Sequence, residues 1–116
     1  MPIVDVRTSA SASALVQAQL LEDLVEITSS LLGKAPEVTM AAIQCDQALL
    51  FRGNRDPAAT IEVRGIGLPE PGALASLAAD LSRLLDEVLD IPPARTFVLF
   101  EDVPASRWAV GGKLLG

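Results

Sequence analysis

The chain contains no histidine and no tyrosine, and Cys45 is its single cysteine. Without histidine, the nucleophile–base pairs of most hydrolases and the usual transition-metal clusters cannot be assembled. A single cysteine excludes an intrachain disulfide, and we therefore expect a reducing cytosol as the compartment. The sequence predicts neither a metal nor another cofactor, so any catalytic group must be a less common one.

Positive charge and long apolar runs are also scarce. Lys and Arg number 9 against 15 Asp and Glu, which gives a formal net charge of -6. Nucleic-acid binding needs clustered basic residues, so we expect no nucleic-acid partner. The N-terminus lacks the pattern of a signal peptide, and no apolar run reaches the roughly 18 residues that cross a bilayer. We expect a cytoplasmic protein with no membrane partner.

The chain repeats itself with an offset of 57 residues. Val4-Asp5-Val6-Arg7 reappears as Ile61-Glu62-Val63-Arg64, and the same offset relates Leu32 to Leu89 and Pro36 to Pro93. Half of the 116 residues are hydrophobic, which is enough for the core of one small domain. We therefore expect a single domain, residues 1–116, with two similar halves at about 1–57 and 58–116.

Each half is predicted to follow the order strand, helix, strand. Leucine and other apolar residues recur at helical spacing in both halves: Leu20, Leu24, Ile27 and Leu31 in the first, and Leu74, Leu77, Leu81, Leu84 and Val88 in the second. Gly33 is expected to end the first helix. The strands that follow the helices are predicted at residues 38–45 and 96–101, each parallel to the strand before its helix.

Two such units predict an α+β fold, in which a four-stranded mixed sheet carries two helices on one face. The other face of the sheet then needs cover. Association into a cyclic oligomer is the simplest remedy.

Pro2 is the candidate catalytic residue. Initiator methionine is normally removed before a small second residue, and its removal would leave a secondary amine at Pro2. Such an amine is a base near neutral pH when desolvation and a nearby cation disfavour its charged form. Lys34 is the candidate cation, and it would also pair with a substrate carboxylate. Alternatively, Pro2 is an ordinary terminal residue and Lys34 a surface charge at a helix end.

Several motifs occur together in this chain. They are Met1-Pro2, residues 31–36 (LLGKAP), Gly53-Asn54 followed by Asp56-Pro57, Ile66-Gly67, residues 91–95 (IPPAR) and residues 100–105 (FEDVPA). In this combination the chain resembles the macrophage migration inhibitory factor family, including its bacterial phenylpyruvate tautomerase-like members. The resemblance runs nearly from end to end.

The resemblance implies a homotrimer with pockets between its subunits and no cofactor. It implies a keto–enol tautomerase of phenylpyruvate-like 2-oxo acids, with the N-terminal proline as general acid and base. Pro2 matches that proline and Lys34 matches the carboxylate-binding lysine of the family. Ile66 matches the residue whose backbone amide contacts the substrate.

The chain departs from the family at other pocket positions. Phe97 stands where the family has a tyrosine from the neighbouring subunit, and Leu99 stands where it has an asparagine. The resemblance therefore implies that Phe97 and Leu99 are substrate-binding positions. Because residues 97 and 99 share one strand face, we expect that wall of the pocket to be apolar. An aromatic residue of the tail is replaced by Leu115. The replacements at positions 97 and 99 remove hydrogen bonds from the pocket.

Two other functions stay open. The lost hydrogen bonds favour a catalytically weakened trimer that binds a protein or a small hydrophobic acid. A relative that hydrates, dehalogenates or decarboxylates small acids would need further charged groups, and Arg64 is the candidate for that role. Residues 56–59 (DPAA) occupy the place of the Cys-x-x-Cys pair of animal members. The chain lacks that cysteine pair, to which the redox activity of animal members is attributed, and we therefore predict no oxidoreductase activity.

Overall fold

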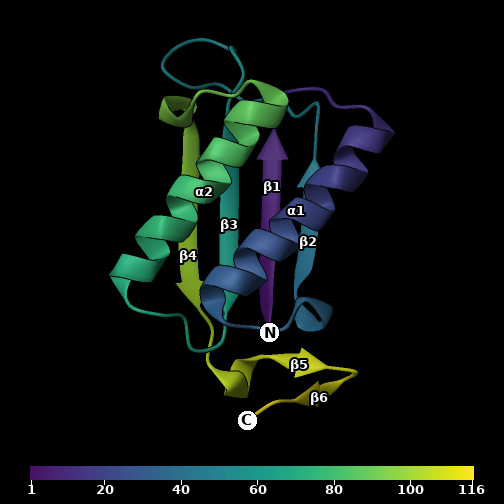
Figure 1. Cartoon of the computed structure of the whole chain (residues 1–116), viewed down its shortest axis with the longest axis vertical. Coiled ribbons are helices and arrows are strands. Elements are labelled where there is room, and N and C mark those ends of the chain that lie inside the picture. The colour runs from purple at the N-terminus through teal and green to yellow at the C-terminus, as the bar shows by residue number, and fades with distance from the viewer.

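The two central strands consist of alternating apolar and polar residues. β1 (Pro2–Thr8) and β3 (Ala59–Gly65) bury every second side chain, as the period of a half-covered strand requires. The strands pair antiparallel, with Asp5 opposite Glu62. Figure 1 shows the computed structural model, which describes residues 1–116, with these strands at the centre of the sheet.

The outer strands are each parallel to an inner one. β2 (Met40–Gln44) pairs with β1, and β4 (Thr96–Asp102) pairs with β3, so the order across the sheet is β2-β1-β3-β4. The strand expected from residue 38 begins at Met40. Pro36 opens a short 3-10 turn, η1 (Pro36–Val38), which the Thr39 N–H closes on the Pro36 carbonyl at 3.0 Å.

The two helices have the same length and the same place in each half. α1 (Ala14–Leu32) begins after Ser13, whose hydroxyl accepts from the Val16 N–H at 3.2 Å. It ends at Gly33, which adopts the left-handed conformation at φ 66° as the sequence predicted. α2 (Pro71–Leu89) ends at Asp90, also left-handed. Neither helix combines the length and the apolar composition needed to cross a membrane.

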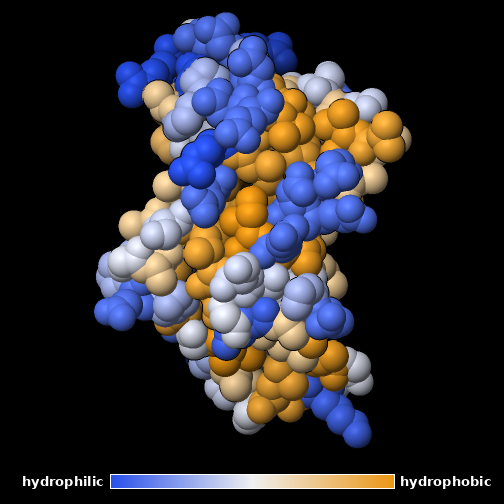
Figure 2. All heavy atoms as spheres, in the orientation of Figure 1, coloured by the Kyte–Doolittle hydropathy of each residue, from blue (hydrophilic) through white to orange (hydrophobic).

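Both helices lie on one face of the sheet, which confirms the predicted mixed α+β arrangement (Figure 1). The core between them consists of aliphatic side chains: Val4, Val6, Ile61 and Val63 from the sheet, and Leu20, Leu24, Leu77, Leu81 and Leu85 from the helices. In the same orientation, Figure 2 shows apolar residues gathered between the hydrophilic outer surfaces of the helices. The centre of the core is therefore aliphatic, in a chain that has only three Phe and one Trp.

The opposite face of the sheet has no cover. Phe97 and Leu99 lie on it with exposed fractions of 55% and 51%. Arg64 bridges two carboxylates there, at 3.0 Å to Glu62 and 3.3 Å to Glu101. The hydrogen bond to Glu101, and then the charge of Glu62, raise the pKa of Arg64 above its ordinary value. The side chains of this face are thus partly apolar and partly ion-paired.

The tail forms a separate small hairpin. After the 3-10 turn η3 (Ala105–Arg107), β5 (Ala109–Val110) and β6 (Lys113–Leu114) pair antiparallel. The turn between them is Gly111-Gly112, with φ values of 60° and 82°, which glycine adopts without strain. Figure 1 shows the hairpin beyond the end of the sheet where β1 begins. The two ends of the chain therefore meet at one end of the molecule.

Candidate active site

Pro2 lies at the head of a central strand. It is the first residue of β1, it is buried, and it lies opposite Gly65 at the end of β3. Proline cannot donate an N–H to the ladder, so within sheets it is confined to places such as the first position of a strand. The next residue, Ile3, pairs with Met40 at the start of β2. Three strands therefore converge on the chain start.

A cavity of about 570 Å³ opens at this point. Its walls come from three segments: Met1, Pro2 and Ile3; Glu37, Val38, Thr39 and Met40; and Trp108, Ala109 and Val110. The lining is mainly apolar, and the volume falls within the roughly 300 to 1,000 Å³ of small-ligand sites. Trp108 was not among the pocket residues expected from the sequence. The available signal was that Trp108 is the single tryptophan of a chain poor in aromatic residues.

The electrostatics of the chain start favour an uncharged amine. Desolvation, and then the positive charge of Lys34, lower the pKa of the terminal ammonium on Met1 from its ordinary 8.0. Lys34 is held in place by the end of α1. Gly33 turns the chain, and the Lys34 N–H donates to the Ser29 carbonyl at 2.9 Å. A cation and a partly desolvated amine thus lie at the same end of the sheet.

Ile66 lies at the same end. It follows Gly65 directly, and Gly65 is the register partner of Pro2. The Ile66 N–H has no acceptor in the chain. A single chain therefore brings Pro2, Lys34 and Ile66 to one end of the sheet.

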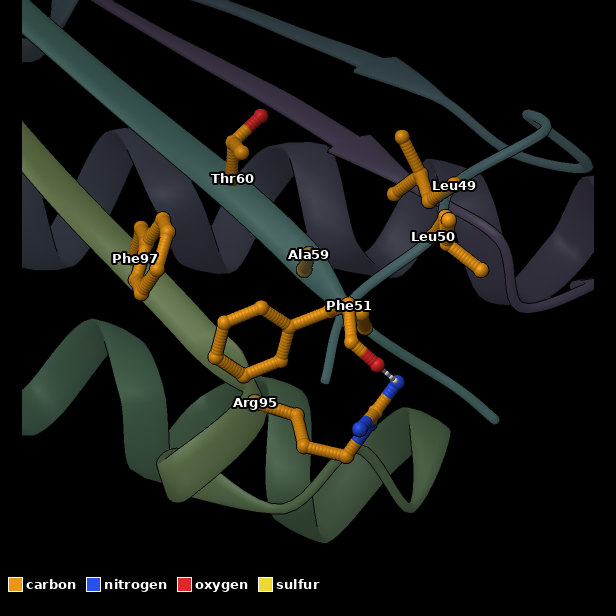
Figure 3. A pocket seen from close by; sticks show the side chains of 8 residues that line it. Leu49, Leu50, Phe51, Ala59, Thr60, Arg95 and Phe97 are labelled. Atoms are coloured by element: carbon orange, nitrogen blue, oxygen red, sulfur yellow. Dashed lines mark hydrogen bonds between the residues drawn. The ribbon is translucent and has the colours of Figure 1, made fainter. Parts of the chain in front are cut away.

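Phe97 lies elsewhere, near the start of β4 (Figure 3). Its ring meets that of Phe51 edge to face, with centroids 5.1 Å apart, beside a small cavity of about 90 Å³. Leu99 lines a separate pocket with Glu62 and Arg64. The residues that line the cavity at Pro2 include none of Phe97, Leu99, Leu115, Lys34 and Ile66. One chain therefore supplies only part of the expected pocket.

Two further features of the side chains bear on metal binding and on the reactivity of the cysteine. No group of three or more His, Cys, Asp or Glu residues is placed to hold a metal ion. Desolvation, and then the charge of Asp46, raise the pKa of the Cys45 thiol. A raised pKa keeps this cysteine in its less reactive thiol form.

Comparisons with known proteins cover the whole chain. The family model "Macrophage migration inhibitory factor (MIF)" matches residues 1–116. A macrophage migration inhibitory factor homolog of Brugia malayi is 29% identical over 116 residues, which is 100% of both chains. The crystal structure of a homologue from Prochlorococcus marinus has a TM-score of 0.93 at 30% identity, over 98% of this chain and 99% of the other.

A second solved structure gives the same result. The macrophage migration inhibitory factor of Toxoplasma gondii has a TM-score of 0.91 at 26% identity, over 97% of this chain and 98% of that one. The family model matches all 116 residues and the fold agrees over 98% of the chain, and the chain therefore belongs to the macrophage migration inhibitory factor family.

Proposed function

We propose that the protein is a keto–enol tautomerase of phenylpyruvate-like 2-oxo acids that works in the cytoplasm. The family belongs to the tautomerase superfamily, which supports an isomerase. One observation carries the proposal: Pro2 is buried at the head of β1 beside a mainly apolar cavity of about 570 Å³. The pKa of the ammonium on Met1, one residue away, is lowered by desolvation and by the charge of Lys34, and the same surroundings would favour the unprotonated form that a base at Pro2 needs.

The chemistry begins with removal of Met1, which gives Pro2 a secondary amine. The neutral amine takes a proton from the carbon next to the keto group, and the electron pair of that C–H bond forms the C=C bond of the enol. The carbonyl π electrons move to oxygen, which receives the proton from the prolyl ammonium. Such proton transfer contributes about 10² to 10⁴ in rate.

The remaining groups hold the substrate. Lys34 pairs with its carboxylate, and the Ile66 amide donates to one of its oxygens. The apolar tail of the substrate lies against Trp108 and Val110. No cofactor takes part in this scheme.

The substrate tail also needs Phe97 and Leu99, which belong to a neighbouring subunit in this proposal. Both lie on the uncovered sheet face, where a second copy can reach them, and each protomer of a homotrimer would lend its open face to the next. The pocket is then complete only in the assembly.

The test is the ketonisation of enol phenylpyruvate, followed by ultraviolet absorbance. The sample must be shown by mass to begin at Pro2. We expect Pro2→Ala to remove most of the activity, while Pro93→Ala, a proline replacement at the far end of the sheet, retains it. Activity that survives in Pro2→Ala contradicts the role of the prolyl nitrogen. Activity that persists when Met1 is retained contradicts the role of a free amine at residue 2.

A second candidate function is a trimer of the same fold that binds a small hydrophobic acid or a protein with little catalysis. It is favoured by Phe97 and Leu99, since neither side chain can donate a hydrogen bond to a substrate. Saturable binding of phenylpyruvate without ketonisation, equal with and without Met1, would favour this function. Hydration, dehalogenation or decarboxylation with Arg64 as the charged group has less support, because the salt bridges to Glu62 and Glu101 already neutralise the positive charge of Arg64.

A further inference from the structure

The turn that follows β3 is tied to the end of β4. Gly65 is the register partner both of Pro2 in β1 and of Asp102 in β4. The Val103 N–H donates to the Gly65 carbonyl at 2.8 Å. The Gly67 N–H donates to Oδ1 of Asp102 at 3.0 Å. One backbone bond and one side-chain bond therefore hold the residues on either side of Ile66.

The conformation of the turn depends on this attachment. Gly67 has φ +67°, in the left-handed region that glycine enters freely and leaves freely. A residue of this kind does not hold one conformation by itself. The carboxylate of Asp102 selects the conformation in which the Gly67 N–H points at it.

Gly65, at the base of the turn, packs beside Leu68 and Pro2. A Cβ atom added to Gly65 would lie 3.0 Å from Cδ2 of Leu68 and 3.8 Å from Cβ of Pro2. The turn and the chain start are thus in close contact. A shift of the turn changes the surroundings of Pro2 as well.

The Ile66 amide lies between the two held residues, and its N–H has no acceptor in the chain. An unpaired donor with fixed flanks is prepared to bind an oxygen atom, because the cost of ordering it has already been met in the free protein. The ligand expected at this amide is the 2-oxo acid that the neighbouring Pro2 site is proposed to bind.

We propose that Asp102 is a positioning residue of this site. By accepting from Gly67, it holds the Ile66 amide where a carboxylate or keto oxygen of the substrate binds. Asp102 itself does not touch the substrate. The inference rests on the proposed function for the identity of the ligand, and its test is a binding measurement that needs no turnover.

The probe is phenylglyoxylate, a 2-oxo acid that has no hydrogen on the carbon next to its keto group and so cannot enolise. Its binding is followed by the fluorescence of Trp108, the single tryptophan, which lines the Pro2 cavity. We expect Asp102→Ala to weaken binding about 10-fold, the size of one lost hydrogen bond. Asp102→Asn keeps an oxygen acceptor and is expected to stay within about 3-fold of the wild type.

Two further measurements separate positioning from general damage. Amide exchange at Gly67 should be faster in Asp102→Ala than in Asp102→Asn. Glu87→Ala removes an equivalent exposed charge from α2 and should bind the probe as the wild type does. In the ketonisation assay, Asp102→Ala should raise KM more than it lowers kcat, because the amide binds the substrate before and during the reaction.

The outcomes distinguish the two proposals. If the wild type binds phenylglyoxylate but does not ketonise phenylpyruvate, the tautomerase function fails, and the comparison of Asp102 variants still decides the inference. Equal affinity of wild type and Asp102→Ala, with faster exchange at Gly67, overturns the role of Asp102. The same holds if Asp102→Asn binds as weakly as Asp102→Ala, or if the wild type does not bind the probe.

Discussion

At the scale of single residues, the chain start depends on a balance of charge and burial. Pro2 is buried, whereas Lys34 is half-buried at the end of α1. The lowered pKa of the terminal ammonium has desolvation as its first cause and the charge of Lys34 as its second. Removing Lys34 should therefore reverse only part of the pKa shift of the amine, because desolvation remains.

We expect Lys34→Ala to raise the pKa of the terminal amine. Loss of the positive neighbour stabilises the ammonium, so a higher pH is needed to populate the neutral base. The ascending limb of kcat/KM against pH should then move to higher pH, and KM should rise about 10-fold through loss of the carboxylate partner. Arg55→Ala, which removes an exposed cation from the loop between β2 and β3 at the other end of the sheet, is the control. An ascending limb that stays in place or moves to lower pH contradicts this role.

At the scale of secondary-structure elements, two buried threonines differ in how they are satisfied. The Thr28 hydroxyl, inside α1, has no hydrogen-bond partner. The Thr8 hydroxyl, at the end of β1, donates to the Ala58 carbonyl at 2.8 Å and accepts from the Ala10 N–H at 3.1 Å. The same substitution should therefore have opposite effects at the two positions.

Thr28→Val should increase the free energy of unfolding by about 1 kcal/mol, since it removes a polar group that is buried without a partner. Thr8→Val should decrease it by about 1 to 2 kcal/mol, because it leaves the Ala58 carbonyl and the Ala10 N–H with one partner fewer. Urea denaturation of both variants measures the difference. A destabilised Thr28→Val would mean that its hydroxyl is satisfied in solution.

Another element-scale contact holds the loop between β2 and β3. Arg95 donates to the carbonyls of Phe51, Asp56 and Pro57 at 3.3, 3.0 and 3.0 Å. Its guanidinium also lies 5.2 Å from the centre of the Phe51 ring (Figure 3). The Phe51 ring packs against the Phe97 ring. Arg95 therefore supports, through Phe51, the Phe97 side chain that is proposed to face the pocket of a neighbouring subunit.

We expect Arg95→Ala to lower the free energy of unfolding by about 2 kcal/mol and to speed proteolysis in the loop, because three carbonyls lose a charged donor. Arg95→Lys should recover only part of this loss, since an ammonium lacks the planar fork of a guanidinium. Arg83→Ala, which removes an exposed arginine from α2, provides the comparison. Unchanged proteolysis of the loop in Arg95→Ala would contradict the contact.

At the scale of the whole molecule, the uncovered sheet face and the projecting hairpin both leave apolar side chains in water. Leu99 is 51% exposed on the sheet, and Leu114 is 63% exposed on the hairpin. Figure 2 shows apolar atoms at the end of the molecule where the hairpin lies. Burial of such surfaces against other copies is favourable, by about 25 cal/mol for each Å² of apolar area.

The predicted assembly is a homotrimer with three times the 12.2 kDa mass of one chain. Leu99→Asp should reduce the trimer to smaller species, because it places a charge on the face that the assembly buries. Leu15→Asp, at an 82% exposed position of α1, should leave the mass unchanged. Sedimentation measures both variants. A wild-type protein that sediments as a monomer would rule out the pocket between subunits.

Local features of the fold were readable from the sequence. The helical spacing of leucines and the stop at Gly33 were predicted from residues that are neighbours along the chain, because periodicity and left-handed backbone are local properties. The same reasoning placed β2 two residues early. The apolar pattern begins at Val38, but Val38 is the last residue of the 3-10 turn that Pro36 opens, so the strand starts after it.

The candidate site was only partly readable. The sequence by itself determined the tandem strand–helix–strand order, an aliphatic core and the identities of Pro2 and Lys34 as candidates. Only the tertiary structure decided that Gly65 and its turn lie beside Pro2, and that Trp108 returns from the tail to form a wall of the cavity. These contacts join residues 63 and 106 positions apart. No local pattern encodes them, because they follow from strand pairing and packing across the whole chain.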